Sequence, residues 1–208
     1  MFSWIMVACT MLLLMNACGN SRPLPIAQDK PMQVAKQEAG PSASIQRLRM
    51  QAEKRNVEAQ FALGQAYDRG RDAPKDKTEA VRWYRLAALQ GDAFAQNALA
   101  DNYWEGTGVP KDDREAVRWW RLAADRGFAP AQHSLGKILA GGGQGVSADK
   151  PQAYMWLMLS AAQGDEEAGR QADILSKQLK PSEVTSIKKL VNQWKPNRAS
   201  TTVNKVGS

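Results

Sequence analysis

The chain has few of the residues that carry covalent or metal chemistry. It contains one histidine, His133, and two cysteines, Cys9 and Cys18, among 208 residues. A Ser/His/Asp set cannot be built convincingly around a single histidine, and no His and Cys residues have zinc-ligand spacing. Both cysteines stand in the first 18 residues, so they cannot staple a folded domain. The sequence therefore predicts no catalytic residue, no metal site and no cofactor.

Long apolar runs are also missing. The longest, residues 4–15, is too short to span a bilayer, for which about 20 residues are needed. It lies within the first 17 residues, which carry no charged side chain, and it has the length of a signal-peptide core. We therefore predict a signal peptide at residues 1–17.

The residues after this run are Ala17-Cys18-Gly19-Asn20. They resemble a bacterial lipoprotein signal, in which the cysteine becomes the lipidated first residue. The resemblance implies lipidation at Cys18, a membrane contact through the lipid and, with Gly19 after the cysteine, an outer-membrane lipoprotein that faces the periplasm. Met15 departs from the usual leucine, and no Lys or Arg precedes the run. An ordinary cleaved signal or a retained anchor stays an alternative, and with it a soluble periplasmic or secreted protein.

The middle of the chain has no excess of positive or negative charge. The net charge is +7, yet residues 59–165 carry 13 basic and 13 acidic side chains, so the excess lies in the flanks. A nucleic-acid-binding face would gather basic and aromatic residues on the folded part. We therefore predict no nucleic-acid partner, and solvated flanks that can approach anionic lipid or cell wall.

Two segments lack any helical period. Residues 18–43 contain four prolines among polar residues and are predicted to be the lipidated cysteine followed by a flexible tether. Residues 195–208 are predicted to be a disordered tail. The folded domain is expected between them, at residues 44–194.

The chain does contain one sequence motif that occurs three times. The letters Glu-Ala-Val-Arg-Trp at residues 79–83 return at residues 115–119, a shift of 36, and a looser copy ends at Ala153 and Trp156. The three copies span about residues 57–92, 93–128 and 129–165. A fixed period of this size predicts an array in which each unit buries its face on the next.

Each copy predicts two antiparallel helices. The second helix begins at Asp76, Asp112 or Asp149, followed three residues later by Glu or Gln, the pattern of a capping box. A glycine ends each of these helices. Residues 166–194 add two closing helices, the second of which is expected to begin at Ser182. Residues at helical spacing form the predicted core: Leu63, Tyr67, Trp83, Leu99, Tyr103, Trp119, Leu135 and Trp156.

These motifs resemble the Sel-one-like repeat (SLR), a relative of the tetratricopeptide repeat. Residues 95–127 match nearly throughout, with Ala100 in place of a usual glycine, whereas the third copy has Leu139 for tyrosine and one extra residue in its glycine-rich loop. The resemblance implies an all-α solenoid of three antiparallel helix-pair repeats with capping helices at both ends. It also implies a role in assembling or regulating multiprotein complexes.

Candidate binding residues are positions that vary between the copies. Trp104 aligns with Asp68 and Ala140, so an exposed aromatic there would suit a partner. Arg82 and Arg118 form a basic row that the third copy replaces with Met155, and Met158 replaces a second arginine. Either the closing helices cover these methionines, or the methionines form an adaptable binding patch.

The sequence thus predicts a non-catalytic, monomeric adaptor that binds a protein or peptide in a groove lined by the first helices. One fragment supports an alternative from another class. Ser186-Ile187-Lys188-Lys189 fits the Ser-x-x-Lys motif of penicillin-binding enzymes, although their other motifs are absent. The alternative is a cell-wall ligand binder, or a weak penicillin-binding or β-lactamase-like enzyme.

Overall fold

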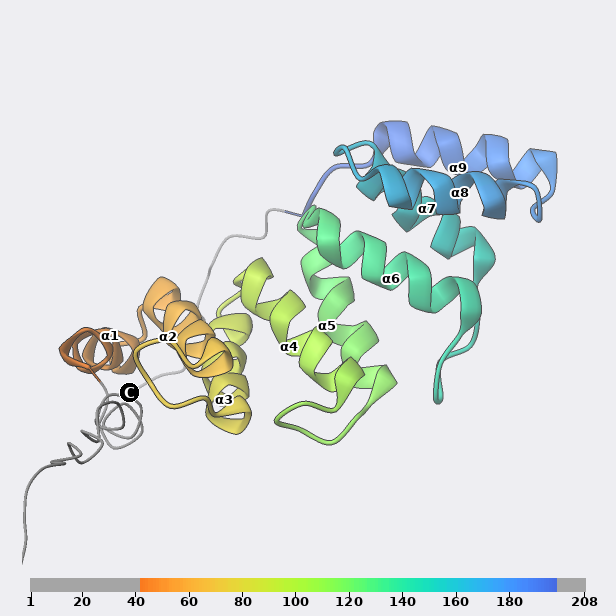
Figure 1. Cartoon of the computed structure of the whole chain (residues 1–208). Helices are drawn as coiled ribbons and strands as arrows, with labels where there is room; N and C mark the ends of the chain where they lie inside the picture. Colours follow the sequence, from red (N-terminus) through yellow and green to blue (C-terminus); the bar gives the residue numbers. More distant parts are fainter. Residues whose placement is uncertain (1–41, 198–208) are drawn as a thin grey trace, which may run out of the picture. The chain divides into compact units, whose positions relative to one another are not determined.

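The computed structural model describes residues 42–197, and these residues confirm the all-α prediction. Apart from one isolated bridge between Gly143 and Val146, their regular structure is helical (Figure 1). None of the helices among residues 42–197 has both the length and the apolar character needed to cross a membrane. In chain order the helices are α1 (Ala43–Glu53), α2 (Val57–Arg69), α3 (Lys77–Leu89), α4 (Ala93–Glu105), α5 (Asp113–Asp125), α6 (Ala129–Gly141), α7 (Lys150–Ala161), α8 (Glu166–Ser176) and α9 (Pro181–Gln193).

Short polar side chains begin most of these helices. The carboxylates of Asp76, Asp112 and Asp149 accept the backbone N–H three residues on, and Asn56 and Asp92 do the same for α2 and α4. Each such cap contributes about 0.5–2 kcal/mol, because it satisfies an amide that the helix leaves without a partner.

The second half of the predicted capping box is wrong for α3, α5 and α7. The backbone N–H of Asp76 donates to Tyr67 O at 3.0 Å, that of Asp112 to Tyr103 O at 2.9 Å and that of Asp149 to Leu139 O at 2.7 Å. Because the first helix of the same repeat already satisfies these amides, the carboxylates of Glu79 and Glu115 are available for other partners.

The last helix also begins earlier than predicted. It starts at Pro181, not after Ser182, because the backbone N–H of Lys180 donates to Glu183 Oε2 at 2.9 Å. Proline suits the first helical position, where its missing N–H removes no helical bond.

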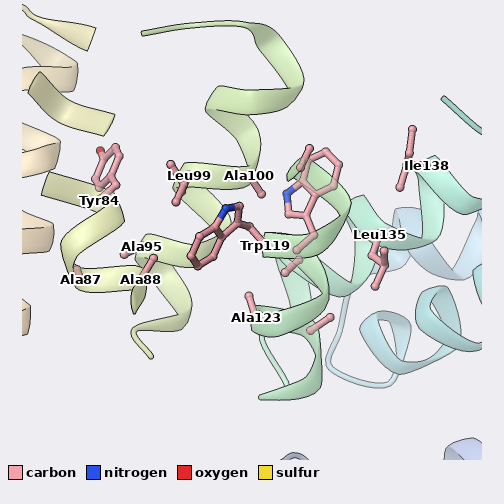
Figure 2. Packing of buried hydrophobic residues seen from close by; sticks show 14 of the residues in the cluster. Tyr84, Ala87, Ala88, Ala95, Leu99, Ala100, Trp119, Ala123, Leu135 and Ile138 are labelled. Atoms are coloured by element: carbon pink, nitrogen blue, oxygen red, sulfur yellow. The ribbon is translucent and has the colours of Figure 1, made fainter. Parts of the chain in front are cut away.

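Successive helices pack against one another. The pairs α2/α3, α4/α5 and α6/α7 form the three repeats, α1 packs on α2, and both α8 and α9 pack on α7 (Figure 1). The core between them combines alanines with a tryptophan at the same position of each repeat, and the second repeat adds Trp120. Figure 2 shows the ring of Trp119 among Ala95, Leu99 and Ala123. Small residues permit the close approach, since a Cβ on Gly64 would lie 2.5 Å from the Tyr84 ring.

A buried glutamine links each repeat to the preceding helix. The side-chain amide of Gln60 donates to Ala52 O at 3.0 Å, and Gln96 and Gln132 repeat this bond to Ala88 O and Ala124 O at 3.0 and 3.1 Å. All three glutamines are at most 3% exposed. Each bond satisfies a carbonyl near a helix end that packing hides from water.

The chain after α9 departs from the predicted tail. Residues 195–197, expected to be disordered, return to the turn between α5 and α6, where the backbone N–H of Asn197 donates to Asp125 O at 2.7 Å. A Cβ on Gly127 would lie 3.2 Å from Pro196 Cβ, so the glycine makes room for the segment. The rest of the predicted tail, the signal peptide, Cys18 and most of the tether lie outside the described residues.

Candidate partner-binding surface

Arginine and glutamate surround the core tryptophan in the first two repeats. The guanidinium of Arg82 lies 4.9 Å from the centre of the Trp83 ring and pairs with Glu79 at 3.0 Å, and Glu79 Oε1 also accepts the Trp83 indole N–H at 2.8 Å. Arg118, Glu115 and Trp119 repeat the arrangement in α5. The two predicted binding arginines are thus exposed, and they cover the tryptophans from outside.

The third repeat lacks this arrangement. Gln152 stands where Glu79 and Glu115 stand, and its side-chain amide donates to Asp149 Oδ2 at 2.7 Å. The Trp156 indole nitrogen is buried and has no hydrogen-bond partner among the described residues. Trp194 lies edge-on to the Trp156 ring at 6.5 Å, and α9 packs on α7. Met155 and Met158 are half-buried on α7.

Trp104 lies between two neighbours. Its ring centre is 5.9 Å from that of Trp120, and the ammonium of Lys111 is 4.0 Å from it. Lys111 also donates to Trp104 O at 2.8 Å. The side chain retains 37% exposure, so it is a partly covered surface residue.

A half-buried carboxyl lies beside this pair of tryptophans. Asp101 accepts the Trp120 indole N–H and the Asn97 side-chain amide, each at 2.9 Å. Burial raises the pKa of Asp101 to about 6, although the hydrogen bond from Trp120 acts to lower it. The carboxyl therefore gains or loses its proton near pH 6.

A row of three phenylalanines, which we call the phenylalanine row, connects the first helices of all three repeats. The ring centres of Phe61 and Phe94 are 5.9 Å apart, and those of Phe94 and Phe128 are 4.8 Å apart in an edge-to-face arrangement. Phe61 also contacts the buried Tyr84 at 5.7 Å, which anchors the row to the core. Phe94 is 57% exposed, whereas Phe61 and Phe128 are half-buried.

The sequence analysis missed this row, yet one signal was available. Phe128 occupies the position at which Asn56, Asp92 and Asp165 cap the other first helices, and α6 consequently has no side-chain cap bond. An aromatic residue in place of a cap sacrifices about 0.5–2 kcal/mol of helix stability. Such a substitution points to a use for the ring itself.

His133 belongs to a small polar link between α6 and α8. Its Nδ1 lies 2.7 Å from Asp165 Oδ2, and the Ser160 hydroxyl lies 3.0 Å from the same oxygen. Burial acts to raise the pKa of Asp165, but hydrogen bonds from Ala168, Ser160 and His133 outweigh it and lower the pKa. The serine therefore contacts the acid and not the histidine, which is unlike a Ser/His/Asp triad.

The structure also shows where the Ser-x-x-Lys fragment and the predicted core residues lie. Ser186 and Lys189 are both exposed on α9, and the Ser186 hydroxyl donates to Ser182 O at 2.9 Å. Residues 42–197 hold no group of three His, Cys, Asp or Glu side chains that could bind a metal. Seven of the predicted core residues are at most 7% exposed, and Tyr103 is half-buried with its hydroxyl bonded to Arg85. The seven are Leu63, Tyr67, Trp83, Leu99, Trp119, Leu135 and Trp156.

Comparison with known proteins gives one family. The model of the Sel1 repeat matches residues 57–92, 93–128 and 129–165. No curated protein matches the chain. The solved Sel1 repeat protein from Oxalobacter formigenes is 36% identical over 64% of this chain and 98% of its own, with a TM-score of 0.58. The c5321 protective antigen of uropathogenic Escherichia coli, which displays an SLR fold, is 26% identical over 73% of this chain, with a TM-score of 0.54; this chain spans 40% of that antigen.

Proposed function

Because this chain belongs to the Sel1 repeat family, whose members generally act as protein-interaction scaffolds, we propose that it is a non-catalytic adaptor for a protein or peptide partner. The partner is a segment of another envelope protein, held by apolar side chains on the phenylalanine row. Monomeric adaptors of this kind need no cofactor, since their work is binding.

One observation carries the proposal: Phe94 is 57% exposed at the centre of a row that spans three repeats. A phenyl ring held between two other rings loses little entropy when a partner covers it. Exposed apolar side chains that form a continuous surface are typical of interaction sites. Trp104 lies near the other end of α4, about 15 Å away by the helical rise, and forms a second anchor.

The test is site-specific photo-crosslinking in intact cells, with the photoreactive residue at position 94 or at position 190. Leu190 is a matched control, because it is 56% exposed on α9, away from the first helices. We expect a discrete crosslinked protein from position 94 that position 190 does not give. Phe128→Ser should weaken it at unchanged protein level, and Trp104→Ala should weaken it less. Equal crosslinking from both positions would contradict the proposal.

We also propose that the adaptor is an outer-membrane lipoprotein on the periplasmic side, anchored through Cys18. The support is the Ala17-Cys18-Gly19 sequence after a short apolar run. One acyl chain gives marginal membrane binding, whereas several give stable anchoring, at about 0.8 kcal/mol per buried CH₂. Mass spectrometry of the native N-terminus should find an acylated cysteine. An unmodified peptide that runs through Cys18 would leave a soluble periplasmic or secreted protein.

The proposal of no catalysis rests on the neighbourhood of Ser186. Its hydroxyl donates to Ser182 O within its own helix, and the side chains of Ser186 and Lys189 are both exposed. Nucleophilic serines of penicillin-binding enzymes need a base and an oxyanion site around them. Incubation with fluorescent penicillin should leave the purified protein unlabelled, and labelling that Ser186→Ala removes would establish the enzyme instead.

A further inference from the structure

A surface pocket lies between the end of α1 and the side of α3, and none of the three phenylalanines lines it. Its volume is about 420 Å³. Leu86 and Leu89, which are 37% and 66% exposed, give it an apolar rim beside the buried ring of Trp83. We call this pocket the first groove. Its lining residues are Ala52, Glu53, Arg55, Gln60, Arg82, Trp83, Leu86, Leu89 and Gln90.

Each lining residue has a counterpart in the third repeat, because the repeat period relates them. Trp83 corresponds to Trp156, Arg55 to Gly127 and Glu53 to Asp125. The glutamine pair of the groove is also the same: Gln90 donates to Gln60 Oε1 at 2.7 Å, and Gln163 donates to Gln132 Oε1 at 2.8 Å. The first and third repeats therefore build one kind of groove.

In the third repeat the chain fills this groove with its own residues 194–197. Trp194 lies edge-on to Trp156 with ring centres 6.5 Å apart, Pro196 sits against Gly127, and the backbone N–H of Asn197 donates to Asp125 O at 2.7 Å. A groove of this kind thus holds an aromatic side chain, a proline two residues later and a backbone N–H donor.

The second repeat fills the same place differently. Arg126 replaces the donor glutamine, and its guanidinium lies where a side chain on Gly91 would need to be, 2.9 Å from the Cβ position. Here the arginine occupies the space that Pro196 occupies beside Gly127. The first groove has neither filler and keeps the glutamine pair and an open volume, but Arg55 stands at the glycine position and the guanidinium of Arg82 lies over the Trp83 ring.

We propose that the first groove binds an extended segment of a partner protein with the pattern aromatic–acidic–proline. The aromatic residue and the proline follow from the chain's own segment, which runs Trp194-Lys195-Pro196. The acidic residue follows from charge: Arg55 stands where the third groove has Gly127, and Arg82, which also pairs with Glu79, stands where it has Met155, so a carboxylate is favoured in place of Lys195.

This inference goes beyond the adaptor function on the phenylalanine row, because it assigns a different surface and a sequence pattern for its ligand. An adaptor with both surfaces could hold two partners at once, one along the first helices and one against α3.

The test uses two heptapeptides with the full-length, ¹⁵N-labelled protein. One has the sequence of residues 193–199, Gln-Trp-Lys-Pro-Asn-Arg-Ala, and the other replaces its lysine with aspartate. We expect saturable shifts of the Trp83 indole and Gln90 side-chain signals with the aspartate peptide. The lysine peptide should bind about fivefold more weakly, because like charges would meet in the groove.

Two test variants and two control variants locate the site. Leu89→Glu should weaken the aspartate peptide about tenfold, since it puts a charge on the apolar rim, whereas Leu190→Glu on α9 should change affinity less than about twofold. Arg55→Glu should reverse the preference between the peptides. Phe94→Ser should leave peptide binding unchanged, so failure here and failure of the adaptor proposal are separate results.

Several outcomes would overturn the inference. Shifts that do not saturate, that map to other helices or that survive Leu89→Glu would show that the groove does not bind this pattern. Shifts that depend on protein concentration alone would show that the groove binds a second copy of the chain. Shifts of the same signals when residues 198–208 are removed, without peptide, would show that the groove binds the chain's own C-terminal residues.

Discussion

The second helices of the second and third repeats, α5 and α7, carry a tryptophan at the same repeat position but in different surroundings. In α5, Trp119 donates its indole N–H to Glu115 and lies under the guanidinium of Arg118, which faces solvent. In α7, Trp156 has no hydrogen-bond partner at its indole nitrogen and lies against Trp194 from the chain after α9. Both rings are at most 5% exposed. Equal burial is therefore reached with a charged cover in one repeat and an apolar cover in the other.

The difference follows from position in the array. An internal repeat leaves the outer side of its second helix to water, where an ion pair keeps its charges hydrated and shields the ring. The last repeat has an end to close, and α8 and α9 both pack on α7, where Met155 and Met158 are half-buried against the core.

Removal of Trp119 should have the largest effect, because it takes the central ring from the middle repeat. Trp119→Ala is expected to lower the free energy of unfolding by about 3–5 kcal/mol, measured by urea denaturation followed by circular dichroism. Trp119→Phe is the control, since it keeps most of the ring and loses the bond to Glu115. A Trp119→Ala protein with an unchanged midpoint would mean that this ring does not hold the repeats together.

Removal of the apolar cover should cost less. Trp194 is half-buried, so Trp194→Ala is expected to lower the free energy of unfolding by about 2 kcal/mol and to release residues 195–197 from the α5–α6 turn. Hydrogen exchange at the amide of Asn197 would report the release. Trp104→Ala, at a residue with 37% exposure, should destabilise less. The reverse order of these two variants would contradict the assignment of Trp194 as the cover of the last repeat.

A pH-dependent difference is expected on the inner side of the second repeat. The pKa of Asp101 is raised to about 6 in the folded protein, so the folded state binds this proton more tightly than the unfolded state. The stabilisation that comes from protonated Asp101 is therefore fully present below about pH 4 and is lost as the pH rises to about 6. Asp101→Asn should gain on the order of 1–2 kcal/mol relative to wild type at pH 7, and little at pH 4.

Thermal midpoints of both proteins at several pH values would measure this gain. Asn97 Oδ1, which has no partner among the described residues, can accept from the new amide if the Asn97 side chain flips. A constant difference between the two proteins from pH 4 to pH 7 would show that Asp101 does not titrate in this range.

The smallest effect should come from a change that makes the third repeat resemble the second. Gln152→Glu places a carboxylate where Glu115 stands, within reach of the Trp156 indole and of Arg121, which now contacts Gln152 Oε1 at 3.4 Å. We expect a gain of about 0.5–1.5 kcal/mol in the free energy of unfolding. Gln152→Ala controls for the lost bond to Asp149 and should destabilise. A destabilised Gln152→Glu protein would show that the indole nitrogen is shielded from this position.

The fold could be predicted because its determinants repeat along the sequence. Asp76, Asp112 and Asp149 mark the helix starts, and the period fixes which alanines and tryptophans face inward. The role of Glu79 could not be predicted from its neighbours: the cap amide that it was expected to bind is taken by Tyr67 O, nine residues earlier and across a loop. Residues 195–197 look like a tail in the sequence, since only the folded α5–α6 turn gives them a partner.

The candidate site was harder to foresee than the fold. Trp104 was found because it varies between aligned positions, and the structure leaves it partly exposed. The phenylalanine row was missed because its members occupy three different repeat positions: Phe61 within a helix, Phe94 in a first turn and Phe128 at a cap. Alignment separates them, and only the folded chain brings the rings together.

The glutamine bonds between repeats have a consequence for how such a chain can change in length. Each junction uses the same pair of groups, a side-chain amide and the carbonyl eight residues before it, and each pair recurs after 36 residues. A duplicated or deleted unit of one period would restore the same bond at the new junction. Gene duplication could therefore lengthen or shorten the array and keep this bond at every junction, and the helices that close its end would not have to change.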